Sequence, residues 1–315
     1  MMEKTEQFIH RTESPQGETP PAPASRVRAR TFLVPLILMV LHHLVLNVVA
    51  IGWLVYYLLV NLVSSSEFLM DPYNSTLPME LLTESGALTY ASLIGMLILI
   101  PLYLLYILLR KRKKDLLLKK EAATLSQWLY SLVVILGAMG LTQLWMTLLS
   151  SFDPLSLPGR LLQDYLDKVA LVGPDGVAPV LDILATVILV PIGEELLFRG
   201  IIQGEFGKAF RPSVTILLTT VLFAVFHLDL IQGSYVLIAG FSLSMVYYLT
   251  RQIALPIVLH IIYNFIGSGW LSRLAGFGEE ADAILVFVLY GCILLGVAAA
   301  LLLRRLGRQP ARQRA

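Results

Sequence analysis

The chain has 315 residues, of which 57% are hydrophobic and only 15% are charged. An average soluble protein has about 25% charged residues, and a soluble domain of this length has no interior large enough for so many apolar side chains. The composition therefore excludes an ordinary soluble enzyme, a disordered chain and a fibrous repeat, and it predicts an all-α polytopic membrane protein. The sequence contains one cysteine, Cys292, which excludes an intramolecular disulfide and a cysteine-based zinc cluster.

Residues 1–30 are polar and rich in proline, glutamate, serine and threonine, which predicts a disordered cytoplasmic tail. This tail is not a signal peptide, because no apolar core follows directly on a short basic start. After it, apolar runs alternate with polar loops, and a helix needs roughly 20 apolar residues to cross a bilayer core of ~30 Å. The runs predict eight transmembrane helices, of which the sixth and seventh are short. They cover residues 31–62, 87–109, 126–150, 178–200, 213–231, 234–250, 254–271 and 283–303.

Basic residues gather in alternate loops, which is the pattern of the positive-inside rule. The outer loops contain only Arg160, Lys168 and Arg273, whereas most loop acids lie there. Both termini are therefore predicted to be cytoplasmic, and the basic clusters are interpreted as topology signals near lipid headgroups rather than as nucleic-acid sites. In the outer segment 159–171, apolar residues at helical spacing predict a short amphipathic helix. The predicted cytoplasmic clusters are residues 1–30, 110–125, 199–212, Arg251 and 304–315.

Charged side chains at membrane depth cost several kcal/mol, so each of them needs a physical reason. The first group of such residues lies in the fourth span. Glu195 and Arg199 are four residues apart with the carboxylate first, the favourable order for an ion pair on a helix. Glu194 lies about 140° around the helix from Arg199. It is therefore left free to face another group, as a general base would.

Two further groups lie on the following spans. His260 and Asn264 are four residues apart, so both can donate hydrogen bonds toward one point, which an oxyanion hole requires. Phe223 and His227 also share a helix face, and the phenyl ring could separate the histidine from lipid. Counting along straight helices leaves Glu194 and His227 at different depths, which predicts a recessed turn after Ile231.

Other ionisable residues in the spans have simpler interpretations. His42 and His43 are predicted to make interhelical hydrogen bonds or packing contacts in the first span. Asp182 and Asp229 are predicted to lie near the outer interface, in solvated or helix-end positions.

The three motifs, in this order, resemble the CAAX-protease and bacteriocin-processing family, also called the Abi family of glutamic intramembrane endopeptidases. The family pattern is Glu-Glu-x-x-x-Arg, then Phe-x-x-x-His, then His-x-x-x-Asn, and all three are intact at 194–199, 223–227 and 260–264. The resemblance covers roughly residues 124–270. It implies that a glutamate and a histidine activate water, that a histidine and an asparagine hold the oxyanion, and that further residues support the site. The implied catalytic residues are Glu194, His227, His260 and Asn264, and the supporting ones are Glu195, Arg199 and Phe223.

This resemblance implies an intramembrane endopeptidase core at 124–270, preceded at 31–123 by two spans and a basic loop. A last span at 271–304 and a basic tail at 305–315 follow the core. The implied partners are the lipid bilayer and a membrane-associated or lipidated substrate, such as a prenylated CAAX protein or a bacteriocin-like peptide, without cofactor, metal or nucleic acid. A bacterial plasma membrane is the expected location.

Two alternative functions stay open at this point. Two histidines and a carboxylate are legitimate zinc ligands, so zinc-dependent hydrolysis is one alternative. The other is a non-proteolytic membrane partner, regulator or proton relay, in which the same polar cluster has a structural or proton-carrying role.

Overall fold

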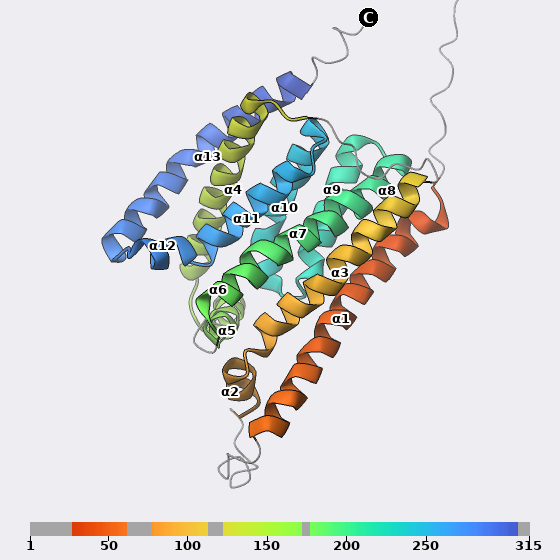
Figure 1. Cartoon of the computed structure of the whole chain (residues 1–315). Coiled ribbons are helices and arrows are strands. Elements are labelled where there is room, and N and C mark those ends of the chain that lie inside the picture. Colours follow the sequence, from red (N-terminus) through yellow and green to blue (C-terminus); the bar gives the residue numbers. More distant parts are fainter. Residues whose placement is uncertain (1–26, 62–76, 113–121, 172–176, 308–315) are drawn as a thin grey trace, which may run out of the picture.

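The structure, a computed structural model, describes residues 27–61, 77–112, 122–171 and 177–307. Within these ranges every regular element is a helix and none is a strand, which confirms the all-α class (Figure 1). The first helix begins at Ala29, so the predicted tail at 1–30 is two residues too long. Most of that tail, much of the basic 110–125 loop and the last eight residues lie outside the described ranges.

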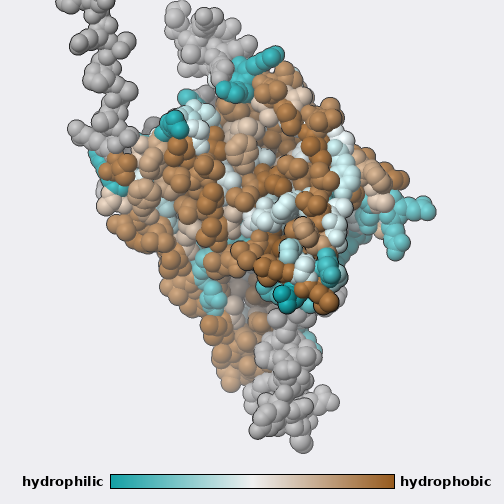
Figure 2. All heavy atoms as spheres, turned by 180° about the vertical axis from the view of Figure 1, so that it is seen from behind, coloured by the Kyte–Doolittle hydropathy of each residue, from teal (hydrophilic) through white to brown (hydrophobic). Residues whose placement is uncertain are grey.

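Five helices of the described part are long and apolar enough to cross a membrane. Two shorter apolar helices accompany them, namely α9 (Pro212–Phe226) and α11 (Ala254–Gly267). Hydrophobic side chains cover most of one face of the molecule, and hydrophilic ones gather toward its upper end and again lower down (Figure 2). The chain is therefore an integral membrane protein. The five long helices are α1 (Ala29–Asn61), α3 (Ala87–Arg112), α4 (Leu125–Ser150), α10 (Leu230–Thr250) and α13 (Glu279–Gly307).

The predicted fourth span is part of a longer helical run that contains two π-helical stretches. Pro191 lies in the first turn of α7 and supplies no backbone N–H, and the residues just before it are π-helical. The run continues to Ala209, and Arg199 lies inside it with 0% exposure. The assignment of Arg199 to a cytoplasmic loop at 199–212 is therefore wrong, because apolar residues and the ion pair carry the helix past this position. The elements of the run are α6 (Pro179–Asp182), η2 (Ile183–Leu189), α7 (Val190–Glu195), η3 (Leu196–Ile202) and α8 (Gln203–Ala209).

The break between α9 and α10 lies earlier than predicted. The α9 helix ends at Phe226, Leu228 has a φ of 54°, and Asp229 caps α10 by accepting hydrogen bonds from two backbone N–H groups of its first turn. The predicted spans 213–231 and 234–250 are therefore wrong at this boundary, because the aspartate cap starts the next helix at Leu230. The predicted helix-end role of Asp229 is confirmed.

Three short helices lie along the lower and left edge of the bundle, whereas α8 and the described end of α13 lie at its upper edge (Figure 1). They are α2 (Leu77–Glu84), α5 (Leu157–Leu171) and α12 (Trp270–Ala275). The α5 helix confirms the predicted amphipathic helix at 159–171, and it packs against α4 and α10 with Leu162 buried.

Glycines allow α4 and α13 to approach each other closely. A Cβ added at Gly140 would lie 2.0 Å from the carbonyl oxygen of Leu289, and one added at Gly137 would lie 2.9 Å from the Cα of Gly296. Small residues are the usual means of bringing membrane helices into backbone contact. Each predicted span overlaps at least one helix of the structure, and the number of membrane crossings and the position of the termini stay predictions.

Candidate active site

A cavity of about 560 Å³ is lined by all four side chains predicted to be catalytic. Glu194 comes from α7, His227 follows the last residue of α9, and His260 and Asn264 come from α11. Phe223 lines the same cavity. The structure therefore brings together residues that are up to 70 positions apart in the sequence, and it places them around one space.

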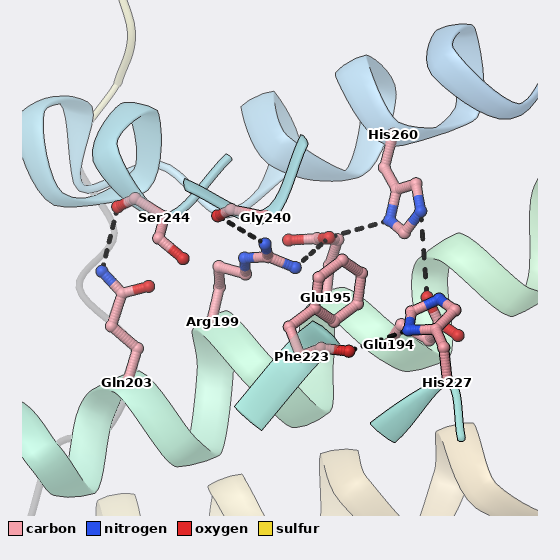
Figure 3. Close-up of polar contacts among 9 residues, drawn as sticks. All are labelled: Glu194, Glu195, Arg199, Gln203, Phe223, His227, Gly240, Ser244 and His260. Carbon is pink, nitrogen blue, oxygen red and sulfur yellow. Dashed lines mark hydrogen bonds and ion pairs between the residues drawn. The ribbon is translucent and has the colours of Figure 1, made fainter. Parts of the chain in front are cut away.

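Glu195 is the centre of a fully buried polar cluster behind this cavity. Its Oε1 accepts a hydrogen bond from Nη1 of Arg199 at 2.6 Å and another from Nδ1 of His260 at 2.8 Å (Figure 3). The predicted ion pair between Glu195 and Arg199 is thus present, and both side chains have 0% exposure. A buried carboxylate requires such partners, because an uncompensated charge in a low-dielectric interior is very unfavourable.

The Arg199 guanidinium is held on two further sides. Its Nη2 donates to the carbonyl oxygen of Gly240 on α10 at 3.0 Å, and its Cζ lies 4.5 Å from the centre of the Phe223 ring. A cation over an aromatic face is attracted by the ring quadrupole. Gly240 must lack a side chain, since a Cβ there would lie 2.8 Å from Cδ1 of Phe223.

His260 links this buried cluster to the cavity. Because its Nδ1 donates to Glu195, its Nε2 is directed toward Glu194, and it lies 3.8 Å from Oε2 of that residue (Figure 3). This distance is too long for a hydrogen bond but within the range of an ion pair. Glu195 therefore orients the ring of His260, and Glu194 faces the ring nitrogen that remains.

His227 has a defined tautomer in its neutral form. Its Nδ1 lies 2.8 Å from the carbonyl oxygen of Phe223, and a carbonyl can only accept, so Nδ1 carries the hydrogen. The Nε2 of the neutral ring is then unprotonated and can take up a proton. The Phe223 ring lies edge-on to His227 with 5.0 Å between the ring centres, which agrees with the predicted face-sharing of this pair.

Asn264 donates one hydrogen bond from Nδ2 to the carbonyl oxygen of Thr186 in η2, at 3.2 Å. One N–H of its amide is therefore engaged, and only the second remains for an oxyanion. If Asn264 and His260 donate to one point, as predicted, Asn264 does so with this second amide hydrogen. The hydrogen bond to the carbonyl of Thr186 could not be predicted from the sequence, because every residue has a backbone carbonyl.

The two N-terminal helices, which the resemblance leaves unexplained, pack against the site. The Nδ1 of His42 lies 2.9 Å from the hydroxyl of Tyr103, and Nε2 of His43 donates to the carbonyl oxygen of Phe226 at 3.0 Å. The predicted interhelical hydrogen bonds of His42 and His43 are therefore confirmed. The second of them holds the last turn of α9, directly before His227.

Two acids have contacts that the sequence did not predict. Asp182 accepts hydrogen bonds from the Trp270 indole and the Thr89 hydroxyl, so it joins three segments rather than facing solvent alone. Glu205, with 1% exposure, forms an ion pair with Arg110 on α3 at 2.8 Å. In the sequence, the only indication of this ion pair was that Glu205 lies in the basic segment 199–212.

Two polar pairs lie at or near the cavity, beyond the side chains predicted to be catalytic. The hydroxyls of Tyr165 and Tyr235 lie 2.8 Å apart, and Lys168 forms an ion pair with Asp229 at 3.0 Å. Burial raises the pKa of the Tyr165 phenol, so the hydroxyl stays protonated. These contacts connect α5 to α10 and to the short loop that carries His227.

No group of three histidine, cysteine, aspartate or glutamate side chains in the described part of the chain is arranged to hold a metal ion. Glu195, one of the acids that could have served, already accepts hydrogen bonds from Arg199 and His260. The donor set therefore does not fit the zinc alternative.

The fold and the cavity define a helical membrane protein with two glutamates and two histidines gathered in its interior. Residues 176–266 match the family model described as type II CAAX prenyl endopeptidase Rce1-like. This segment contains all three motifs, and the match confirms the family resemblance that they predict. Comparisons with curated proteins and with solved structures gave no significant match. The family suggests a membrane protease with a membrane-embedded polypeptide substrate.

Proposed function

We propose that the chain is a glutamate-dependent intramembrane endopeptidase that hydrolyses a peptide bond of a membrane-associated or lipidated polypeptide. The observation that carries this proposal is that Glu194, His227, His260 and Asn264 line the same cavity. A polar network that only holds helices together has no need of a cavity, whereas hydrolysis needs room for water and a peptide. Wholly structural polar residues in membrane proteins face one another rather than an open space.

In this mechanism Glu194 and His227 activate a water molecule. Glu194, assisted by the unprotonated Nε2 of His227, takes one proton from the water, whose oxygen then forms a bond to the peptide carbonyl carbon. General-base assistance of this kind contributes about 10²–10⁴-fold to a rate. The carbon–nitrogen bond then breaks, and the same proton passes to the leaving amine.

The oxyanion formed by this attack is held by Nε2–H of His260 and the free N–H of Asn264. For His260 to donate from Nε2 it must be protonated on both nitrogens, since Nδ1 already donates to Glu195.

The decisive experiment compares the wild-type protein with Glu194→Gln, which removes the charge and keeps the shape. Membranes that contain each form are examined by N-terminal proteomics, and we expect new N-termini of the wild type to fall at least about 100-fold with Glu194→Gln. Asn264→Ala should reduce the rate by about 10²–10³-fold, the usual effect of losing one oxyanion donor.

Glu205→Gln is the matched control, because Glu205 is a buried glutamate of the same helical run that does not line the cavity. Its cleavage per folded molecule should stay near that of the wild type. Unchanged cleavage by correctly inserted Glu194→Gln protein would refute the mechanism. It would favour the scaffold or regulator, which should tolerate a near-isosteric change.

A further inference from the structure

The catalytic cavity occupies only one half of the helix bundle. On α4, which runs from residue 125 to 150, the lining residues lie between Met139 and Met146. On α10 they lie at the beginning, from Gln232 to Ala239, and on α11 at the end, from His260 onward. These segments all face the lower end of the bundle, where α5 and α12 lie (Figure 1). The cavity therefore extends from its floor at Glu194 toward that end.

The catalytic groups Glu194 and His227 lie at a similar depth in the bundle. His227 follows a 15-residue helix that begins at Pro212, which places it about 22 Å from the upper end of the bundle. Glu194 precedes Ala209, the end of its helical run, by the same number of residues. Glu194 also follows Pro179, the first residue of that run, by 15 residues, so it lies at the middle of the run. Glu194 and His227 are therefore equally far from the upper ends of their helices, and the short α9 resolves the depth difference that straight helices predicted.

The two ends of the bundle differ in charge. Basic residues lie at the upper end, where α1 and α9 begin and α3, α8, α10 and α13 end. Acidic residues predominate at the lower end, around α5 and the start of α13. By the positive-inside rule the upper end is cytoplasmic and the lower end is extracytoplasmic. The basic set includes Arg30, Arg110, Lys208, Arg211, Arg251 and Arg304, and the acidic set includes Asp153, Asp164, Asp167, Glu279, Glu280 and Asp282.

We infer that the active site opens to the extracytoplasmic side and cleaves a membrane-anchored polypeptide in its extracytoplasmic juxtamembrane segment. This inference rests on the proposed proteolytic function, and it names the substrate class. A lipidated tail that stays on the cytoplasmic face would meet the half of the bundle that the cavity lining does not reach. The inferred substrate therefore differs from the prenylated cytoplasmic tail that the family resemblance implies.

The structure around the opening fits a substrate that enters at the level of the membrane interface. The α5 helix is amphipathic and carries exposed acids on its polar face, as helices that lie in the interface do. It borders the cavity with Tyr165 and is tied to the loop after His227 by the pair of Lys168 and Asp229. A polypeptide segment leaving the bilayer beside α5 meets the catalytic side chains without crossing the hydrocarbon core.

The side of access can be measured with single cysteines in a full-length Cys292→Ser background. Ser268→Cys places a thiol at the exposed rim of the cavity, and Ser213→Cys is the matched control in the exposed first turn of α9 at the basic end. Intact cells are treated with a membrane-impermeant maleimide. We expect Ser268→Cys to react in intact cells and Ser213→Cys to react only after permeabilisation. The reverse result, or equal labelling of both in intact cells, would overturn the inference.

The substrate class is read from the sites that disappear in Glu194→Gln membranes. Sites next to the extracytoplasmic end of a membrane-spanning segment support the inference, whereas sites in cytoplasmic tails overturn it while leaving proteolysis intact. If no site depends on Glu194 but Ser268→Cys is labelled from outside, the proposed function fails and the direction of access stands. The two failures are thus distinguishable.

Discussion

The buried pair of Glu195 and Arg199 allows a quantitative test of the site. Both side chains are fully buried, and Nη1 of Arg199 lies 2.6 Å from Oε1 of Glu195. Two unit charges ~4 Å apart attract each other by about 4 kcal/mol at an effective dielectric constant of 20. Glu195→Gln keeps the shape and hydrogen-bond acceptor but leaves the guanidinium uncompensated. We expect the free energy of unfolding to fall by about 3–5 kcal/mol, the usual cost of breaking a buried pair.

The assay is reversible unfolding of the purified full-length protein by SDS in mixed micelles, followed by tryptophan fluorescence. Arg199→Met is measured alone and together with Glu195→Gln, because the double variant restores neutrality. Its loss of stability should be smaller than the sum of the single losses by at least about 0.5 kcal/mol, and up to about 3 kcal/mol. Asp164→Asn, an exposed acid on α5, should change stability by no more than about 0.5 kcal/mol. A loss below about 1 kcal/mol for Glu195→Gln, or strict additivity in the double variant, would show that the pair does not stabilise the fold as argued.

Three further predictions concern packing, capping and buried hydrogen bonds, and the same unfolding assay checks each of them. Gly140→Ala should destabilise the protein by about 1–3 kcal/mol, since the added Cβ meets a backbone carbonyl of α13. Gly291→Ala, on α13 with open space around it, should be neutral or slightly stabilising, and equal effects of the two would contradict the packing argument. Asp229→Ala should cost about 0.5–2 kcal/mol through the lost cap of α10. Lys168→Ala removes only an exposed ion pair and should cost no more than about 1 kcal/mol, so a larger loss than that of the aspartate variant would be contrary to expectation. Tyr103→Phe leaves the ring nitrogen of a buried histidine on α1 without its partner, and an unchanged stability would be inconsistent with the expected cost of about 1–3 kcal/mol.

The class of the protein, and the side chains that gather at the candidate site, were predictable from the sequence. Apolar runs of span length determine an all-α membrane protein, and the positions of basic residues indicate its orientation. Spacings of four residues identified Glu195 with Arg199 and Phe223 with His227, because such residues always share one face of a helix. The amphipathic α5 followed from the same periodicity.

The boundaries of the helices were less predictable. The break at 227–229 depends on Asp229 capping α10, and the continuation of the fourth helix past Arg199 depends on the buried ion pair. In both places an apolar run alone did not mark the end of the helix, because hydrophobicity does not distinguish a helix interior from a recessed turn.

Only the tertiary structure decided which groups meet across helices. The donation from His260 to Glu195, the support of α9 by His43 and the carbonyl of Gly240 against Arg199 depend on how each helix is rotated and shifted along its axis. Several of these partners are backbone carbonyls, which are the same in every residue and leave no trace in the sequence. Local spacing thus determined which side chains share a helix face, and the packing of the helices determined that Glu194, His227 and His260 meet around one cavity.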